Sequence, residues 1–236
     1  VDMSSMRRGR ATANAMWGNA PSVLVGDFLY SRSFEMMVEL GSMPVMKILS
    51  QATRIIAEGE VLQLSKVRDA STTEETYMEV IRGKTAMLFE ASTHSAAELC
   101  GATAEQCESL RIFGDRLGAA FQLEDDLLDY RGDSGTLGKN VGDDLSEGKP
   151  TLPLIYTMRE GTPEQAALVR RAIQKGGIED MESIRAAVED SGSLEYTAQL
   201  ARDYVALAMQ CLEVLPNSEY RDALVELSEF AITRNY

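Results

Sequence analysis

Residues 121–129, Phe-Gln-Leu-Glu-Asp-Asp-Leu-Leu-Asp, decide the fold class of this chain. At about 100° per residue, residues spaced i, i+3, i+4 and i+7 share one stripe of an α-helix. Four polar residues of the stretch have this spacing, namely Gln122, Asp125, Asp126 and Asp129. Phe121, Leu127 and Leu128, which flank this stripe, are apolar and would face a core. The pattern predicts an amphipathic helix and not a strand.

Helix signals recur along the rest of the chain. Three threonines are each followed three residues later by Glu or Gln, which predicts capping boxes at Thr72 with Glu75, Thr103 with Gln106, and Thr162 with Gln165. We find no alternating strand runs and no hairpin signals. We therefore expect an all-α protein with helices at about 20–40, 43–68, 73–99, 103–131, 150–159, 163–174, 179–190, 193–213 and 217–234.

Composition limits the function classes. The 236 residues carry 23 Lys+Arg against 37 Asp+Glu, a net charge of −14 that argues against a nucleic-acid partner. No Pro/Ser-rich linker divides the chain, so we expect a single domain over residues 1–236. No stretch is apolar enough to span a bilayer, and no signal peptide is visible. Three cysteines, Cys100, Cys107 and Cys211, predict buried thiols and a cytoplasmic location.

The aspartates of the 121–129 stretch form a carboxylate stripe, defined here as Asp125, Asp126 and Asp129. Like charges at this spacing repel each other, so a positive partner should offset them. With oxygen ligands only, such a site favours a hard ion, and Mg²⁺ is the usual choice beside a phosphate group. The alternative is a solvated acidic helix face. A Gly-rich segment between Arg131 and Lys149 follows directly, and long loops in compact helical domains are usually functional.

Several cations stand where a diphosphate would need them. Arg7 and Arg8 lie near Asp2, and Lys84-Thr85 lie among apolar residues of an expected helix. Lys139 and Lys149 bracket the Gly-rich segment. A solvated basic turn for the arginines and a snorkelling side chain for Lys84 are the alternatives.

In this order the residues resemble the trans-isoprenyl diphosphate synthase family. Asp125-Asp126-Leu127-Leu128-Asp129 is similar to its second DDxxD motif, and Gly83-Lys84-Thr85-Ala86 to its Lys-Thr element. Val1-Asp2-Met3 through Arg7-Arg8-Gly9 looks like the tail of its first motif. The sequences of residues 56–64 and 137–154 are similar to those of bacterial octaprenyl diphosphate synthases. The resemblance covers essentially the whole chain.

The resemblance implies an isoprenoid synthase-type helical bundle around a central apolar cavity, a homodimer, and synthesis of polyprenyl tails for respiratory quinones. Mg²⁺ would be held by Asp2, Asp125, Asp126 and Asp129. An allylic diphosphate, such as farnesyl diphosphate, would be held by Arg7, Lys84, Thr85, Gln122 and Lys139, and isopentenyl diphosphate by Arg8. Asp144 and Lys149 would support the closing loop. Lys84, Asp125, Asp126 and Lys139 are the expected catalytic residues.

Two departures and two alternatives accompany this hypothesis. Glu124 stands where an apolar or small residue is usual, and only Asp2 of the first motif is present. We therefore expect the chain to lack N-terminal helices, half of the metal site and part of one substrate site. A non-catalytic subunit of a heteromeric synthase would typically lose the aspartates. A terpene cyclase would lack Arg7-Arg8 and the Lys84-Thr85 element.

Overall fold

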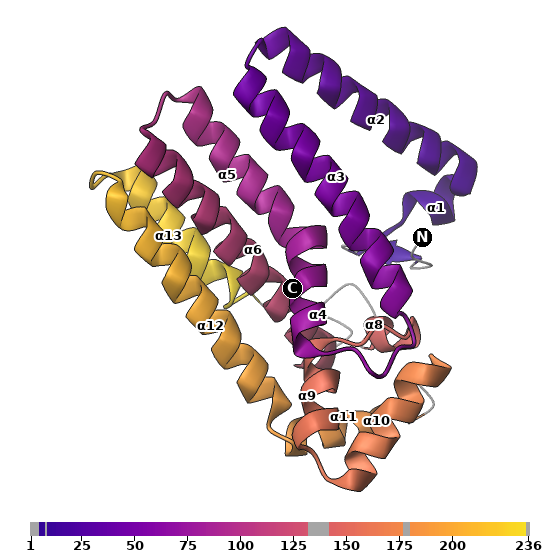
Figure 1. Cartoon of the computed structure of the whole chain (residues 1–236). Coiled ribbons are helices and arrows are strands. Elements are labelled where there is room, and N and C mark those ends of the chain that lie inside the picture. Colours follow the sequence, from indigo (N-terminus) through magenta and orange to yellow (C-terminus); the bar gives the residue numbers. More distant parts are fainter. Residues whose placement is uncertain (1–4, 8, 132–141, 177–179, 235–236) are drawn as a thin grey trace.

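The computed structural model describes residues 5–7, 9–131, 142–176 and 180–234, and this part of the chain is almost entirely helical (Figure 1). Each expected helix is present, with ends within three residues of those expected, although the helix expected at 73–99 is divided in two by a π-helical turn. The helices are α1 (Ala13–Trp17), α2 (Asn19–Leu40), α3 (Met43–Lys66), α4 (Glu74–Ile81), α5 (Met87–Leu99), α6 (Ala104–Arg131), α8 (Asp143–Ser146), α9 (Leu152–Glu160), α10 (Pro163–Lys175), α11 (Met181–Asp190), α12 (Ser193–Cys211) and α13 (Glu219–Ala231).

The structure adds some short elements to those expected. Strands β1 (Met6–Arg7) and β2 (Arg10–Ala11) pair antiparallel near the start of the chain. Helix α1 is also new, and α8 lies within the segment expected to be irregular. A π-helical turn, Arg82–Ala86, joins α4 to α5, and a 3₁₀ turn, Leu212–Val214, follows α12.

Two of the three predicted capping boxes are confirmed. The hydroxyl of Thr103 accepts from the backbone N–H of Gln106 at 3.3 Å, and the Gln106 side chain accepts in return at 3.0 Å. Thr162 and Gln165 form the same pair. The prediction for Thr72 is wrong by one residue, because its hydroxyl donates to the Asp69 carbonyl and Thr73 caps α4 instead.

The expectation of three buried thiols is also only partly right. Cys107 is buried and Cys211 is half-buried, but Cys100 is exposed. Cys100 follows the last residue of α5, where the chain turns toward α6. A helix end of this kind lies outside the packed interior, so its thiol faces solvent.

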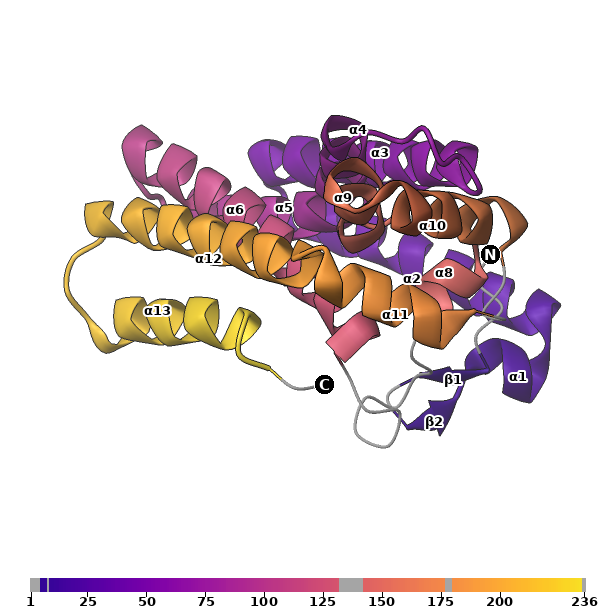
Figure 2. The ribbon, with the colours of Figure 1, turned by 90° about the horizontal axis from the view of Figure 1, so that it is seen from below.

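Helix α6 lies at the centre of the bundle, between α5 and α12 (Figure 1). Its apolar side chains are deeply buried and reach different parts of the core. Phe113 and Leu117 pack with Ala208 and Leu212, whereas Leu123 packs with a second cluster. Figure 2, viewed from below, shows α13 beside α12 on one side of the bundle. The carboxylates of α6 are therefore carried on the most enclosed helix.

Two glycines let α5 and the π-helical turn approach α6 closely. A Cβ built on Gly118 would lie 2.5 Å from the Cα of Ala86, and one built on Gly114 would lie 2.5 Å from the carbonyl oxygen of Phe89. Both are distances that backbone atoms cannot accommodate without moving. These contacts fix how α6 sits against the Lys84-Thr85 element.

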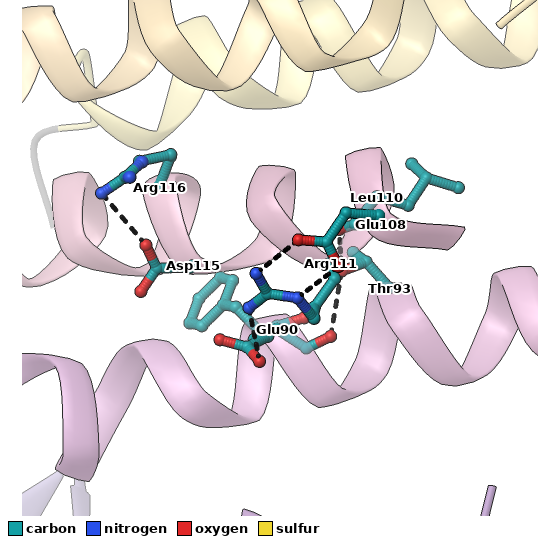
Figure 3. A network of polar contacts seen from close by, with 8 residues as sticks. Glu90, Thr93, Glu108, Leu110, Arg111, Asp115 and Arg116 are labelled. Carbon is teal, nitrogen blue, oxygen red and sulfur yellow. Dashed lines mark hydrogen bonds and ion pairs between the residues drawn. The ribbon is translucent and has the colours of Figure 1, made fainter. Parts of the chain in front are cut away.

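A polar network holds the outer half of the same crossing (Figure 3). The Arg111 guanidinium on α6 donates to Glu108 at 2.8 and 2.9 Å and reaches Glu90 on α5 at 3.1 Å. The Thr93 hydroxyl donates to the carbonyl of Leu110 at 2.7 Å. Since Arg111 joins two helices through one planar group, it ties α5 to α6 beyond the glycine contact.

Helix α2 exposes much apolar surface. It lies against α3 at one edge of the bundle (Figure 1), and Met37 is its buried residue. The exposed large apolar side chains of α2 are Val23, Leu24, Val25, Phe28, Leu29, Tyr30, Met36, Val38 and Leu40. Among the described residues, no helix is both long enough and apolar enough to cross a bilayer.

We expect Gly118→Ala to destabilise the protein by about 1–3 kcal/mol, because the new methyl group overlaps the backbone of the π-helical turn. Gly26→Ala is the matched control. It lies in α2 with nothing within 4 Å of a built Cβ, so helix propensity alone should leave it equally stable or up to about 1 kcal/mol more stable. Urea unfolding of both variants tests this, and equal stabilities would contradict it.

Candidate diphosphate and metal site

The carboxylate stripe is placed on the last turns of α6. Asp126 is 2% exposed and Asp129 is 1% exposed, whereas the Asp125 side chain is 34% exposed. A solvated acidic face is therefore wrong for two of its three members. Burying carboxylates is costly unless donors or cations meet them.

A chain of hydrogen bonds links the stripe to the Lys-Thr element. The Thr85 hydroxyl donates to Gln122 Oε1 at 2.9 Å, and Gln122 Nε2 donates to Asp126 Oδ1 at 2.8 Å. Tyr77 on α4 donates its hydroxyl to Asp126 Oδ2 at 2.6 Å. Three of the predicted site residues, Thr85, Gln122 and Asp126, are thus brought into one connected group.

The surroundings of Asp126 and Tyr77 disfavour a negative charge on either side chain. Burial, together with the charge of Asp144 and then that of Asp125, raises the pKa of Asp126 well above its usual value, although the hydrogen bond from Tyr77 opposes this. Burial and the charge of Asp126 also raise the pKa of Tyr77. Asp144 of α8 is therefore close enough to the carboxylate stripe for its charge to act on Asp126.

Lys84 is held by α3. Its ammonium donates to Gln63 Oε1 at 2.7 Å and lies 3.1 Å from a Glu60 carboxylate oxygen, with its side chain 25% exposed. Gly59 permits this arrangement, because a Cβ there would lie 2.6 Å from the Lys84 backbone nitrogen. Because Lys84 is half-buried and paired, the structure does not favour the alternative of a snorkelling surface side chain.

Helix α8 brings the end of the Gly-rich segment back to α6. The backbone N–H of Gly142 donates to Asp129 Oδ1 at 3.1 Å. Lys149 lies 3.5 Å from Asp144 and 2.5 Å from Glu147, so it is paired within its own turn. Leu145 anchors α8 by full burial in the core.

An unusual backbone residue fixes this turn from the other side. Arg68, after α3, has a φ of 64°, in the left-handed region that L-residues other than Gly seldom adopt. Its N–H donates to the Gly148 carbonyl at 2.8 Å. Gly148 itself has a φ of 77°, and a Cβ there would lie 2.8 Å from the Arg68 side chain. The strained residue thus holds the peptide that precedes Lys149.

Some predicted residues fall outside the described part of the chain. They are Asp2, Arg8, Lys139 and the side chain of Arg7, whose backbone lies in β1. Sequence reasoning also missed contributors that the structure brings to the site: Tyr77, Glu60, Gln63 and Arg234. None of these residues belongs to a recognisable sequence motif, because each reaches the site only when separate helices pack together.

The donor chemistry fits a hard divalent ion. Asp125, Asp126, Asp129 and Asp144 offer only carboxylate oxygens, and burial together with the charges of Asp144 and Asp125 raises the pKa of Asp126. Within the described ranges, no group of three or more acidic, histidine or cysteine side chains is arranged so that it could hold a metal ion. A metal ion at this site would therefore need ligand atoms in addition to those that the described residues bring together.

The helical bundle and its carboxylate-bearing central helix define the class of protein: this is the isoprenoid synthase fold. A polyprenyl synthase from Caulobacter crescentus, in complex with calcium and isoprenyl diphosphate, superposes with a TM-score of 0.94 at 45% identity, covering 99% of this chain and 72% of that one. A decaprenyl diphosphate synthase from Rhodobacter capsulatus gives 0.91 at 44% identity with the same coverage.

The chain belongs to the polyprenyl synthetase family, whose model matches residues 1–191. It is 53% identical over 236 residues to the octaprenyl diphosphate synthase of Escherichia coli, which covers 100% of this chain and 73% of that protein. An all-trans-nonaprenyl-diphosphate synthase (geranyl-diphosphate specific) from Rhodobacter capsulatus is 50% identical over 234 residues, covering 99% and 72%. These relatives are prenyltransferases, and the resemblance predicted from the motifs is confirmed.

We expect Tyr77→Phe to lower the free energy of unfolding by about 1–3 kcal/mol in metal-free buffer, because it leaves a buried Asp126 oxygen without its donor. Tyr220→Phe is the matched control, since Tyr220 is 76% exposed and should be neutral. Chemical denaturation measures both. A neutral Tyr77→Phe would show that the hydrogen bond contributes nothing to the fold.

Proposed function

We propose that this chain is a long-chain trans-polyprenyl diphosphate synthase and that its product is an octaprenyl diphosphate. The observation that carries the proposal is the hydrogen-bonded chain from Thr85 through Gln122 to Asp126, which joins the Lys-Thr element to the carboxylate stripe. The relationship to octaprenyl diphosphate synthases supports the same reaction and product class. The intact aspartates give no support to a non-catalytic subunit.

Asp125, Asp126 and Asp129, with Asp2, are the proposed metal ligands. Mg²⁺ bound there supplies stabilisation of the charge on a departing diphosphate. The calcium complex of the C. crescentus relative supports a divalent ion in this family. Asp126 needs help to stay charged while buried, and the donors Tyr77 and Gln122 provide it.

The cations divide the two substrates between them. In the proposal Arg7, Lys84, Thr85, Gln122 and Lys139 hold the allylic diphosphate. Glu60 and Gln63 hold the Lys84 ammonium against α3.

The second substrate is isopentenyl diphosphate, which Arg8 would hold. Its double bond attacks the allylic carbocation after the diphosphate leaves, and loss of a proton from the resulting cation gives the lengthened allylic product. Lys149, paired with Asp144 and Glu147, supports the turn that follows the Gly-rich segment. Quinone side chains are the proposed use of the product, and the cytoplasm the proposed location.

We expect Asp126→Asn to reduce condensation by about 100-fold or more, because it keeps the size of the side chain and removes one charge that the metal needs. The assay supplies farnesyl and isopentenyl diphosphates with Mg²⁺ and measures product length by chromatography. Asp190→Asn, on the exposed end of α11, is the control and should retain full activity.

The same assay separates the two candidate functions. An octaprenyl product from the wild-type protein supports the synthase. Product that forms only after a second subunit is added would support the non-catalytic alternative. Full activity in Asp126→Asn would mean that the stripe is not the metal site.

We further propose that the apolar face of α2 is covered by a second copy of the chain. Its run of exposed apolar side chains is more typical of an interface than of a solvent-facing helix, and few charges interrupt it. Arg32 forms ion pairs with both Glu35 and Glu39 within the helix, so its charge offsets one of these two negative charges. A homodimer would remove this surface from water.

We expect Leu24→Glu to weaken dimer formation by more than tenfold, because it buries a carboxylate in an apolar interface. Leu207→Glu, at an exposed leucine of α12, is the control and should leave the assembly unchanged. Light scattering after size-exclusion chromatography over a dilution series measures both. A wild-type protein that is monomeric throughout would refute the dimer.

A further inference from the structure

The segment after α13 returns to the carboxylate-bearing end of α6. Helix α13 ends at Ala231, and Ile232 packs against the core cluster that contains Leu123 and Tyr77. The backbone N–H of Arg234 donates to the Phe230 carbonyl at 3.2 Å, which continues the turn. Figure 2 shows α13 beside α12, directed toward this part of the bundle. The Arg234 side chain is consequently placed on α6.

Arg234 makes three contacts with one face of α6. Its Nη2 donates to the Phe121 carbonyl at 3.0 Å, and its guanidinium carbon lies 3.7 Å from the centroid of the Phe121 ring. The same Nη2 lies 3.7 Å from Oδ1 of Asp125, one helical turn further on. The side chain is 11% exposed, although that of Asp125 is 34% exposed. A guanidinium so enclosed has a fixed orientation.

Two of these contacts do not involve Asp125. The ring and the carbonyl of Phe121 hold the guanidinium flat against α6, and the rigid planar group then turns one N–H edge toward the carboxylate. The carboxylates around Asp125 include Asp126, Asp144 and Glu124, of which Asp144 is paired with Lys149. Arg234 is thus an enclosed positive charge beside Asp125, the most exposed member of the carboxylate stripe.

We propose that Arg234 is a positioning residue that holds the Asp125 carboxylate in the orientation in which it binds the divalent ion. The inference rests on the proposed function only in taking Asp125 as a metal ligand. Carboxylate ligands are commonly oriented by a partner outside the metal's own ligand set, and loss of such a partner typically weakens metal binding by 10–100-fold. Because Phe121 retains the guanidinium, Arg234 stays in place when the metal binds.

The test is metal binding without substrate, measured by electron paramagnetic resonance of Mn²⁺ as the probe. Arg234→Met keeps an unbranched side chain over the Phe121 ring and removes the charge and the donors. Arg234→Lys keeps the charge. Arg171→Met, an exposed arginine on α10, controls for the loss of one positive charge. The double variant with Asp125→Asn asks whether the effect passes through Asp125.

We expect Arg234→Met to weaken Mn²⁺ binding by about tenfold, Arg234→Lys to restore part of it, and Arg171→Met to match the wild type. In the Asp125→Asn background, Arg234→Met should have no further effect. Unchanged binding in Arg234→Met, whether or not its thermal stability falls, would overturn the proposal and make Arg234 a purely structural clamp. Tighter binding would overturn it too, since Arg234 would then compete with the metal.

The outcome is separable from that of the proposed function. A wild-type protein that binds Mn²⁺, loses affinity through Arg234 and Asp125, and makes no polyprenyl product would uphold this inference and refute the synthase. Condensation by the wild type together with unchanged Mn²⁺ binding in Arg234→Met would do the reverse. A wild-type protein that binds no Mn²⁺ would overturn the inference directly.

Discussion

The crowding of negative charge on one buried helix face is the constraint on which the rest of the structure depends. Asp126 and Asp129 are enclosed in the bundle and carried on α6 with the half-exposed Asp125. Water cannot solvate the two buried carboxylates, so the protein must supply donors. Tyr77 and Gln122 meet Asp126, and a backbone N–H from the far end of the Gly-rich segment meets Asp129. The neighbouring elements are packed closely enough to deliver these groups to fixed positions.

That requirement explains the unusual local features around α6. Small residues occur where donors must approach, since Gly118 and Gly59 admit the π-helical turn from two sides. Strain is accepted at Arg68, where its N–H fixes the turn that carries Asp144 and Lys149. These features lower stability by themselves, but they place the side chains of the candidate site. The polar clamp at Arg111 and the apolar clusters supply the compensating rigidity.

The helices were predictable because their signals are local. Caps such as Thr162 with Gln165 and the apolar periodicity depend on residues three or four apart, and these expectations were met within three residues. The aspartates, Gln122 and the Lys-Thr element could also be found as motifs. Tyr77 and Arg234 could not, because their partners lie 49 and 113 residues away. Asp2, Arg8 and Lys139 lie outside the described residues, so their roles stay predictions.

The π-helical turn between α4 and α5 has a consequence for helical phase. Tyr77 must face α6 to reach Asp126, and Ala86, nine residues later, must face α6 at Gly118. In an uninterrupted α-helix nine residues rotate through about 900°, which would point the two side chains in opposite directions. The wider turn takes up part of the mismatch over Arg82–Ala86, the segment that contains Lys84 and Thr85. The segment that contains Lys84 and Thr85 therefore also sets the rotation of α5 relative to α4. Deleting one residue from it would turn the α6-facing side of α5 away from α6 and its carboxylates.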